Sequence, residues 1–171
     1  MVMILIKDGR GGKLIVLAHC ILNTNSICQG PVTPRLWPGI ITPVLEKIMG
    51  YNVGVIQLPC PEFIVYGLDR PATNRKELED SGFRGKCREL VSSISEDLRE
   101  YSSKGYKIIG IMGIRSSPSC SAGLKGHEKG IFFEELEKAV KALHLDIPIV
   151  DFERTEVHEC IRRLEEILSS S

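Results

Sequence analysis

Continuous apolar runs alternate with amphipathic segments along this chain. The runs rich in Leu, Ile and Val occupy residues 14–18, 51–60, 106–114 and 146–152. Because they lack a polar residue at every second position, they are typical of strands buried on both faces of a parallel sheet. Between and after them, apolar residues recur at helical spacing, which predicts helices over 40–49, 83–103, 132–143 and 156–168. Thr155 is the expected N-cap of the last helix.

Strands that alternate with helices in this way predict an α/β fold. We expect one Rossmann-like domain over residues 1–171, with helices on both faces of a parallel sheet. The glycines between residues 1–7 and 14–18 indicate a hairpin, which would add residues 1–7 as an antiparallel edge strand. Residues 23–38 are rich in Asn, Pro and Gly and are expected to form a long loop. In such folds the ligand binds outside the carboxyl ends of the strands.

Charge and composition narrow the classes of partner. The 22 Lys and Arg residues balance 22 Asp and Glu residues, so we expect neither a nucleic acid nor a membrane as partner. No apolar run approaches the ~20 residues needed to span a bilayer, and the first residues lack the basic start of a signal peptide. We therefore expect a cytoplasmic protein. In that reducing compartment its six cysteines favour metal binding or catalysis over disulfides.

Three cysteines follow the first three buried runs. Cys20, Cys60 and Cys120 are far apart in sequence, yet parallel strands would bring all three to one edge of the sheet. Three independent core residues are the alternative, but packing does not require cysteine at three strand ends. The pattern favours a thiolate site for a soft metal or an iron–sulfur cluster. Zinc is the simpler choice of metal, although the chain has no C-x-x-C pair.

With three thiolate ligands, a [4Fe–4S] cluster keeps one iron that has no protein ligand. Such an iron can bind substrate as a Lewis acid. We expect the three sulfur atoms to lie roughly 6–7 Å apart, as ligands about 2.3 Å from their metals allow. Cys28, in the 23–38 loop, is a candidate fourth ligand that would occupy the open position of this iron. Cys87 and Cys160 lie in predicted helices and are expected to be small core residues.

Polar residues beside these cysteines are candidates for acid–base chemistry. Glu62 follows Cys60 by two residues and is a candidate proton donor, with helix capping or an ion pair to Arg70 or Arg75 as the alternative. Ser117 precedes Cys120, between Ser116 and Ser119, where turn formation is the alternative role of all three serines.

Other polar features near the site are weaker signals. His19 and His127 are expected to lie outside the ligand set. The glycines at 123, 126 and 130 bracket a loop before the helix at 132, whose first amides we expect to be available for an anion or a substrate carbonyl.

Taken together, these motifs resemble the 2-thiouracil desulfurase family. The family pattern has Cys-Leu-x-Gly after the first strand, Cys-Pro-Glu after the second and Ser-Pro-Ser-Cys-Gly after the third, with Asn23 and Ser121 standing here in place of two of its glycines. The resemblance covers about residues 18–155. The matching segments read HCILN (19–23), PCPEF (59–63), YGLDRP (66–71) and SSPSCSAG (116–123), followed by the helix and strand of 129–153.

The resemblance implies a [4Fe–4S] cluster held by Cys20, Cys60 and Cys120. The free iron would take sulfur from a thiocarbonyl and release it as sulfide without net redox change. The substrate would be a small thiolated nucleobase or a related thioamide. Ser117 matches the first serine of the Ser-Pro-Ser-Cys motif, which lies in the family's active site.

Two other functions stay open at the level of sequence. A cluster-bearing sensor or sulfur carrier would bind a partner protein and show an exposed apolar patch. A metal-free transferase or hydrolase would use Cys120 as nucleophile and needs a paired histidine, for which His19 is the candidate.

Overall fold

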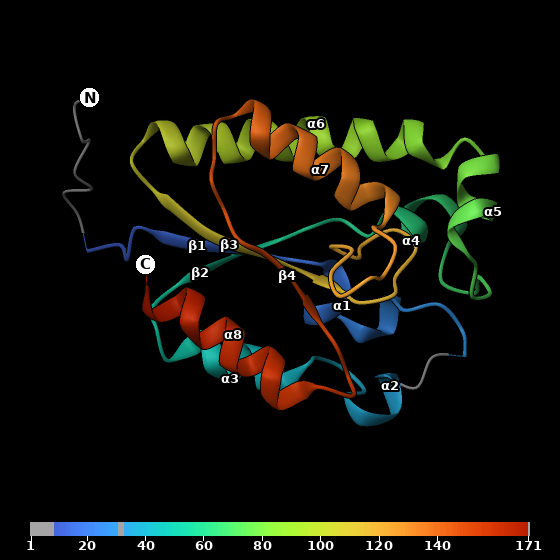
Figure 1. Ribbon diagram of the computed structural model, residues 1–171, viewed down its shortest axis with the longest axis horizontal. Coiled ribbons are helices and arrows are strands. Elements are labelled where there is room, and N and C mark those ends of the chain that lie inside the picture. The colour runs from blue at the N-terminus through green and yellow to red at the C-terminus, as the bar shows by residue number, and fades with distance from the viewer. Residues whose placement is uncertain (1–8, 31–32, 171) are drawn as a thin grey trace.

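Four parallel strands form the centre of the part of the molecule that the structure describes (Figure 1). The computed structural model describes residues 9–30 and 33–170. The strands lie in the order β2-β1-β3-β4, and their bounds are Lys13–Leu17 for β1, Gly54–Gln57 for β2, Lys107–Ile114 for β3 and Ile149–Phe152 for β4. All four were predicted from the apolar runs, and the α/β fold with a parallel sheet is confirmed. The expectation that every run is buried on both faces was wrong for β2, which lies at the edge of the sheet and is partly exposed.

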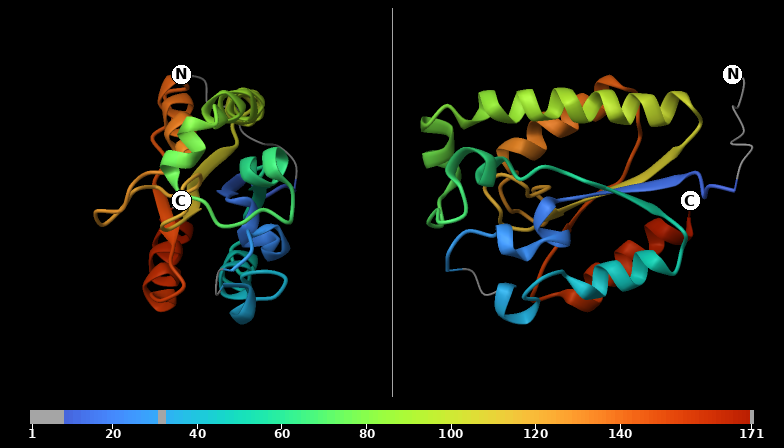
Figure 2. Two further views of the ribbon diagram at one scale, coloured as in Figure 1. Left: turned by 90° about the vertical axis from the view of Figure 1, so that its right-hand side faces the viewer. Right: turned by 180° about the vertical axis from the view of Figure 1, so that it is seen from behind.

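Helices cover both faces of this sheet (Figure 2). One face carries α3 (Thr42–Met49) and α8 (Val157–Ser169), and the other carries α6 (Phe83–Ser103) and α7 (Ile131–Ala142). The chain moves outward from β1 to β2 and then returns across β1 to β3. Because crossovers between parallel strands are right-handed, this reversal moves the connecting helices to the opposite face.

The core explains why these segments form these elements. In β3, six consecutive residues from Ile108 to Gly113 are buried, as expected of a strand covered on both sides. On α6, Cys87, Val91, Ile94 and Leu98 recur at helical spacing and are all buried beneath its polar outer face. No helix within the described part of the chain is both long and apolar enough to cross a membrane.

Several short elements differ from the predictions. The 23–38 segment holds the 3-10 helix η1 (Thr24–Ser26) and the helix α2 (Thr33–Leu36) rather than loop alone. Three further short helices were not predicted: α1 (His19–Leu22), α4 (Pro61–Tyr66) and α5 (Arg75–Asp80). The N-cap of α8 is Glu156 without a side-chain cap bond, so the prediction of Thr155 was wrong. The edge strand predicted at residues 1–7 lies outside the described residues.

The reversal of strand order marks the place where a ligand is expected. In doubly wound sheets, ligands bind at the carboxyl ends of the two strands between which the chain changes direction. Here those strands are β1 and β3. At this end of the sheet the segments that follow β1, β2 and β3 gather, at the right of Figure 1.

Candidate functional site

The three strand-end cysteines converge on one cavity. Cys20 lies on α1 just beyond β1, Cys60 is the N-cap of α4 just beyond β2, and Cys120 lies in the turn that follows β3. All three line the same cavity of about 420 Å³, to which Cys28 also contributes. The predicted convergence at one edge of the sheet is therefore present in the structure.

Burial keeps these thiols protonated in the absence of a metal. Burial, with a further contribution from the charge of Cys60, raises the pKa of Cys20 to about 12. The pKa of Cys120 is raised well above its usual value, first by burial and then by the charges of Cys60 and Cys20. Burial also raises the pKa values of Cys60 and Cys28. A bound metal would remove these protons, because a coordinating thiol is deprotonated.

Polar groups lie close to two of the sulfur atoms. The Phe63 amide donates to Cys60 Sγ at 3.4 Å, and Arg70 Nη2 approaches the same sulfur at 3.7 Å. Ser119 Oγ lies 3.6 Å from Cys120 Sγ. Donors of this kind stabilise thiolate ligands and tune iron–sulfur clusters. The donor set, three soft sulfur atoms with such partners in one cavity, fits an iron–sulfur cluster.

The described residues do not form a ready site for a single metal ion. No group of three His, Cys, Asp or Glu side chains is arranged to hold a single ion in the part of the chain that the structure describes. Four thiolates around one zinc would lie about 3.8 Å from each other, since each is about 2.3 Å from the metal. The wider spacing of roughly 6–7 Å expected for a cluster stays a prediction.

A chain of hydrogen bonds connects Ser117 to Glu62. Ser117 Oγ accepts from the Cys120 amide at 3.0 Å and lies 3.3 Å from Ser119 Oγ. Ser119, only 1 % exposed, donates to Glu62 Oε1 at 2.5 Å. Ser117, Ser119 and Glu62 all line the cavity. Ser117 therefore forms the turn, as its alternative role predicted, while its hydroxyl also faces the cavity.

Arg70 holds Glu62 from the opposite side. The two buried side chains form an ion pair, with Arg70 Nε 3.6 Å from Glu62 Oε2. The other guanidinium nitrogens donate to the Gly67 carbonyl at 2.8 Å and to the Ser26 carbonyl at 2.6 Å. Arg70 Nε has no hydrogen-bond partner among the described residues, although it is buried at the cavity. The predicted ion pair of Glu62 thus exists with Arg70, and Glu62 still reaches the cavity.

Two glycines pack directly against the backbone at Cys120. A Cβ on Gly130 would lie 2.2 Å from the Ser119 carbonyl carbon and 2.5 Å from the Cys120 nitrogen. A Cβ on Gly113 would lie 2.2 Å from the Cys120 carbonyl oxygen. Both contacts are far shorter than real side chains allow, so only glycine permits this packing. The position of Cys120 therefore depends on two residues outside its own loop.

Backbone amides at the start of α7 donate hydrogen bonds to the loop that precedes the helix. The Gly130 amide donates to the Ser121 carbonyl, the Ile131 amide to that of Pro118 and the Phe133 amide to that of Ser119. The expectation that these amides are available for an anion or a substrate carbonyl was therefore wrong. Instead, the loop that carries Cys120 caps the helix that follows it, which fixes the loop at the cavity.

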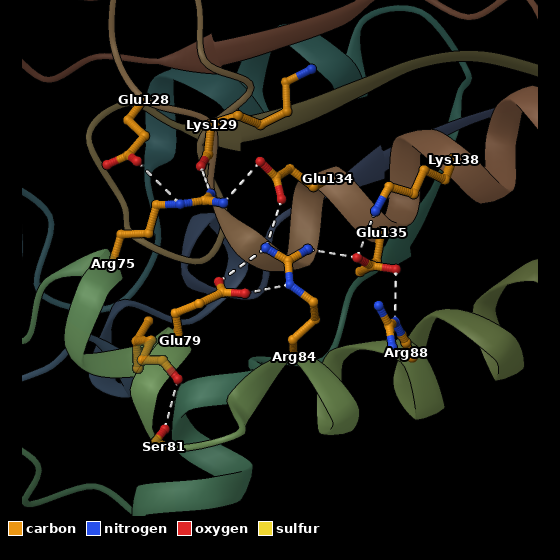
Figure 3. A network of polar contacts seen from close by, with 11 residues as sticks. Arg75, Glu79, Ser81, Arg84, Arg88, Glu128, Lys129, Glu134, Glu135 and Lys138 are labelled. Carbon is orange, nitrogen blue, oxygen red and sulfur yellow. Dashed lines mark hydrogen bonds and ion pairs between the residues drawn. The ribbon is translucent and has the colours of Figure 1, made fainter.

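An ionic network holds the rest of this loop (Figure 3). Arg75 donates to the Lys129 carbonyl and forms ion pairs with Glu128 at 3.2 Å and Glu134 at 2.9 Å. Arg84 continues the network from Glu134 along α6. Since Ala72 and Thr73 line the cavity just before Arg75, the network connects the end of the Cys120 loop to a segment that lines the cavity.

One known protein is similar to this chain over nearly its whole length. No family model matches the chain, and no solved structure matches it. An uncharacterized protein of Methanocaldococcus jannaschii, MJ0003, is 31% identical over 161 residues, which are 93% of this chain and 99% of the archaeal protein. The chain belongs to the MJ0003 family. Because MJ0003 is itself uncharacterized, this membership brings no activity with it.

The remaining sequence candidates lie elsewhere in this MJ0003 family member. Cys87 and Cys160 are buried, at 0% and 2% exposure, and are core residues as predicted. His19 packs its ring near Phe63, and His127 Nδ1 lies 3.2 Å from Ser116 Oγ. Neither histidine is among the described residues that line the cavity.

Several polar residues of the cavity were not singled out as site residues by the sequence, and three of them are buried. Ser119 links Ser117 to Glu62, and the buried Arg70 and Arg115 line the same cavity. Arg115 directly follows the apolar strand β3, which is a signal that could have been used. The burial of Ser119 and Arg70 depends on contacts between distant segments and has no local signature.

Proposed function

We propose that the protein is an iron–sulfur-dependent desulfurase acting on a thiolated nucleobase or a related small thioamide. The observation that carries this proposal is the meeting of Cys20, Cys60 and Cys120 in one cavity with Glu62 and Ser117. The resemblance to the 2-thiouracil desulfurase family supports the same reaction. The free thiols of all six cysteines agree with a reducing compartment, and we place the protein in the cytoplasm.

Cys20, Cys60 and Cys120 would hold a [4Fe–4S] cluster as thiolates. When bound, the cluster supplies a Lewis-acidic iron that receives the sulfur of the substrate. Phe63 and Arg70 would donate to the Cys60 sulfur, since they already contact it. Clusters are tuned by hydrogen bonds of this kind.

The protein's own polar residues would handle the proton. Replacement of a thiocarbonyl sulfur by oxygen consumes water, whose attack requires a proton acceptor and whose product requires a donor. Glu62 can accept the proton through Ser119, to which it is hydrogen-bonded. Ser117, one hydroxyl further along, is placed to orient the water or the substrate. Arg70 keeps the Glu62 carboxylate in position through its buried ion pair.

A metal-free thiol nucleophile is less well supported. Burial and neighbouring thiols raise the pKa of Cys120, so that the unreactive thiol predominates at neutral pH. A catalytic cysteine instead needs a lowered pKa and an adjacent base. The candidate base His19 lies outside the residues described as lining the cavity.

A cluster-bearing sensor or sulfur carrier is the second candidate, because one observation favours it. Phe63, Ile64, Val65 and Tyr66 on α4 are 37–46% exposed, and Leu68 beyond them is 54% exposed. This apolar surface begins three residues after Cys60. A contiguous exposed apolar patch is typical of a protein-binding surface.

Sulfide release separates the two functions. Cluster-loaded protein should release sulfide from 2-thiouracil or another thiolated pyrimidine anaerobically without added reductant. Ser117→Ala, Ser119→Ala and Glu62→Gln should keep their iron but lose roughly 10²–10⁴-fold in rate, the usual worth of a positioned acid–base group. Ser95→Ala, on the far part of α6, is the matched serine control and should retain the wild-type rate.

If loaded protein with intact iron turns over no thiolated base, the sensor or carrier function is the better one. If the base is turned over but all three variants match the wild type, these residues are structural and the proposed proton path is wrong.

A further inference from the structure

Cys28 is a fourth thiol in the cavity, and the proposed function leaves it without a role. It lies in irregular backbone after η1, not at the end of a strand. Its side chain is half-buried and lines the same cavity as the three proposed ligands. A cysteine without a role at the site would not need to line this cavity.

Arg70 fixes the backbone on both sides of Cys28. Its Nη2 donates to the Ser26 carbonyl at 2.6 Å, and its own carbonyl accepts from the Gln29 amide at 3.2 Å. The same guanidinium approaches Cys60 Sγ at 3.7 Å and pairs with Glu62. One buried arginine therefore holds the Cys28 segment on the side of the cavity where Cys60 lies.

A cluster held by three thiolates has one coordination position that this fourth thiol can fill. Three thiolate ligands leave one iron of a [4Fe–4S] cluster open, and a fourth thiol in the same cavity is a soft ligand suited to it. The buried guanidinium of Arg70, which donates to the Ser26 carbonyl two residues before Cys28, would place positive charge near an additional anionic ligand. Cys28 follows no strand and stands in irregular backbone after η1; like Cys20 and Cys60 it is partly exposed, which leaves room for a bond to be exchanged.

We propose that Cys28 is an exchangeable fourth ligand, which occupies the open iron in the resting protein and leaves when a thiocarbonyl sulfur binds. This inference rests on the proposed function, because it requires a cluster held by Cys20, Cys60 and Cys120. In the exchange, the bond between iron and Cys28 Sγ breaks, the substrate sulfur takes its place, and the released thiolate takes a proton from water. No electron is transferred. The resting protein would thereby shield its reactive iron from other ligands.

The test measures which cysteines react with iodoacetamide, by peptide mass spectrometry of anaerobic protein. In apoprotein Cys28 should be alkylated. In loaded protein its alkylation should slow at least 10-fold, and 2-thiouracil should restore it while Cys20, Cys60 and Cys120 stay protected. Cys28→Ala should retain about four irons and change the electron paramagnetic resonance spectrum of the reduced protein. Cys87→Ala, a core cysteine, should leave that spectrum unchanged.

The possible failures point to different errors. Equal alkylation of Cys28 in loaded and apo protein, with the iron intact, overturns the inference and leaves the proposed function standing. Loss of the cluster in Cys28→Ala, or protection that 2-thiouracil does not lift, makes Cys28 a permanent ligand and also overturns it. A wild-type protein that binds no cluster contradicts the proposed function, and this inference falls with it.

Discussion

Replacing Gly130 by alanine tests how the fold positions Cys120. Gly130 has φ −72° and ψ 147°, which alanine adopts freely, so the substitution acts through contact alone. The new Cβ would lie 2.2 Å from the carbonyl carbon and 2.3 Å from the carbonyl oxygen of Ser119, and 2.5 Å from the Cys120 nitrogen. Carbon atoms pack best at about 3.5–4.0 Å, so the Cys120 loop and the start of α7 must separate by about 1 Å or more.

The expected loss of stability follows from this displacement. Overpacking of this kind costs about 1–3 kcal/mol. In a protein of this size each kcal/mol lowers Tm by about 2–4 °C, so Gly130→Ala apoprotein should melt about 2–12 °C below the wild type. The same displacement shifts Cys120 relative to the other two thiols. The variant should therefore also bind less iron on reconstitution, even at temperatures where it is folded.

Circular dichroism melts of the reduced apoprotein and iron analysis after anaerobic reconstitution measure the two effects. Gly85→Ala is the matched control, because a Cβ there has no neighbour within 4 Å and the residue lies in α6. It should keep its iron and gain up to about 1 kcal/mol, since alanine favours helix. Wild-type Tm and iron content in Gly130→Ala would refute the role given to this contact.

Two further predictions concern the ionic network. Although burial opposes it, hydrogen bonds from Lys138 and two arginines of α6 lower the pKa of Glu135 to about 2. Because this folded-state pKa lies below the ordinary 4.5, the stabilisation of the fold by the Glu135 carboxylate should be complete above pH 4.5 and lost as pH falls towards 2. The free energy of unfolding of Glu135→Gln, measured by urea titration, should lack this part of the pH dependence. Arg75→Ala should free the Lys129 carbonyl, so hydrogen exchange should accelerate in residues 123–130 and stay unchanged in β1. Exchange rates in residues 123–130 equal to those of the wild type would show that Arg75 does not hold the loop.

The long elements were predictable because their periodicity extends over many residues. The bounds expected for α6 are those observed, and β3 is buried along its length as its composition indicates. The short helices α1 and α4 have four and six residues, too few for a period of 3.6 to be visible in the sequence. Prediction therefore succeeded where local pattern and tertiary burial agree.

The site shows a similar division. The meeting of Cys20, Cys60 and Cys120 was predictable, because parallel strands bring their carboxyl ends to one edge whatever their separation in sequence. The link from Ser119 to Glu62 was not, since it joins residues 57 positions apart through one hydrogen bond. The first amides of α7 were misjudged because the preceding loop folds back and occupies them.

The central claim is that Cys20, Cys60 and Cys120 together hold a [4Fe–4S] cluster. Its most direct test is the iron and acid-labile sulfide content of anaerobically reconstituted protein, measured for the wild type and for alanine variants of single cysteines. We expect about four of each per chain in the wild type and in Cys87→Ala, and loss of the cluster in Cys20→Ala, Cys60→Ala and Cys120→Ala. A wild type that binds no iron, or a cluster that survives in Cys20→Ala but disappears in Cys87→Ala, would contradict it.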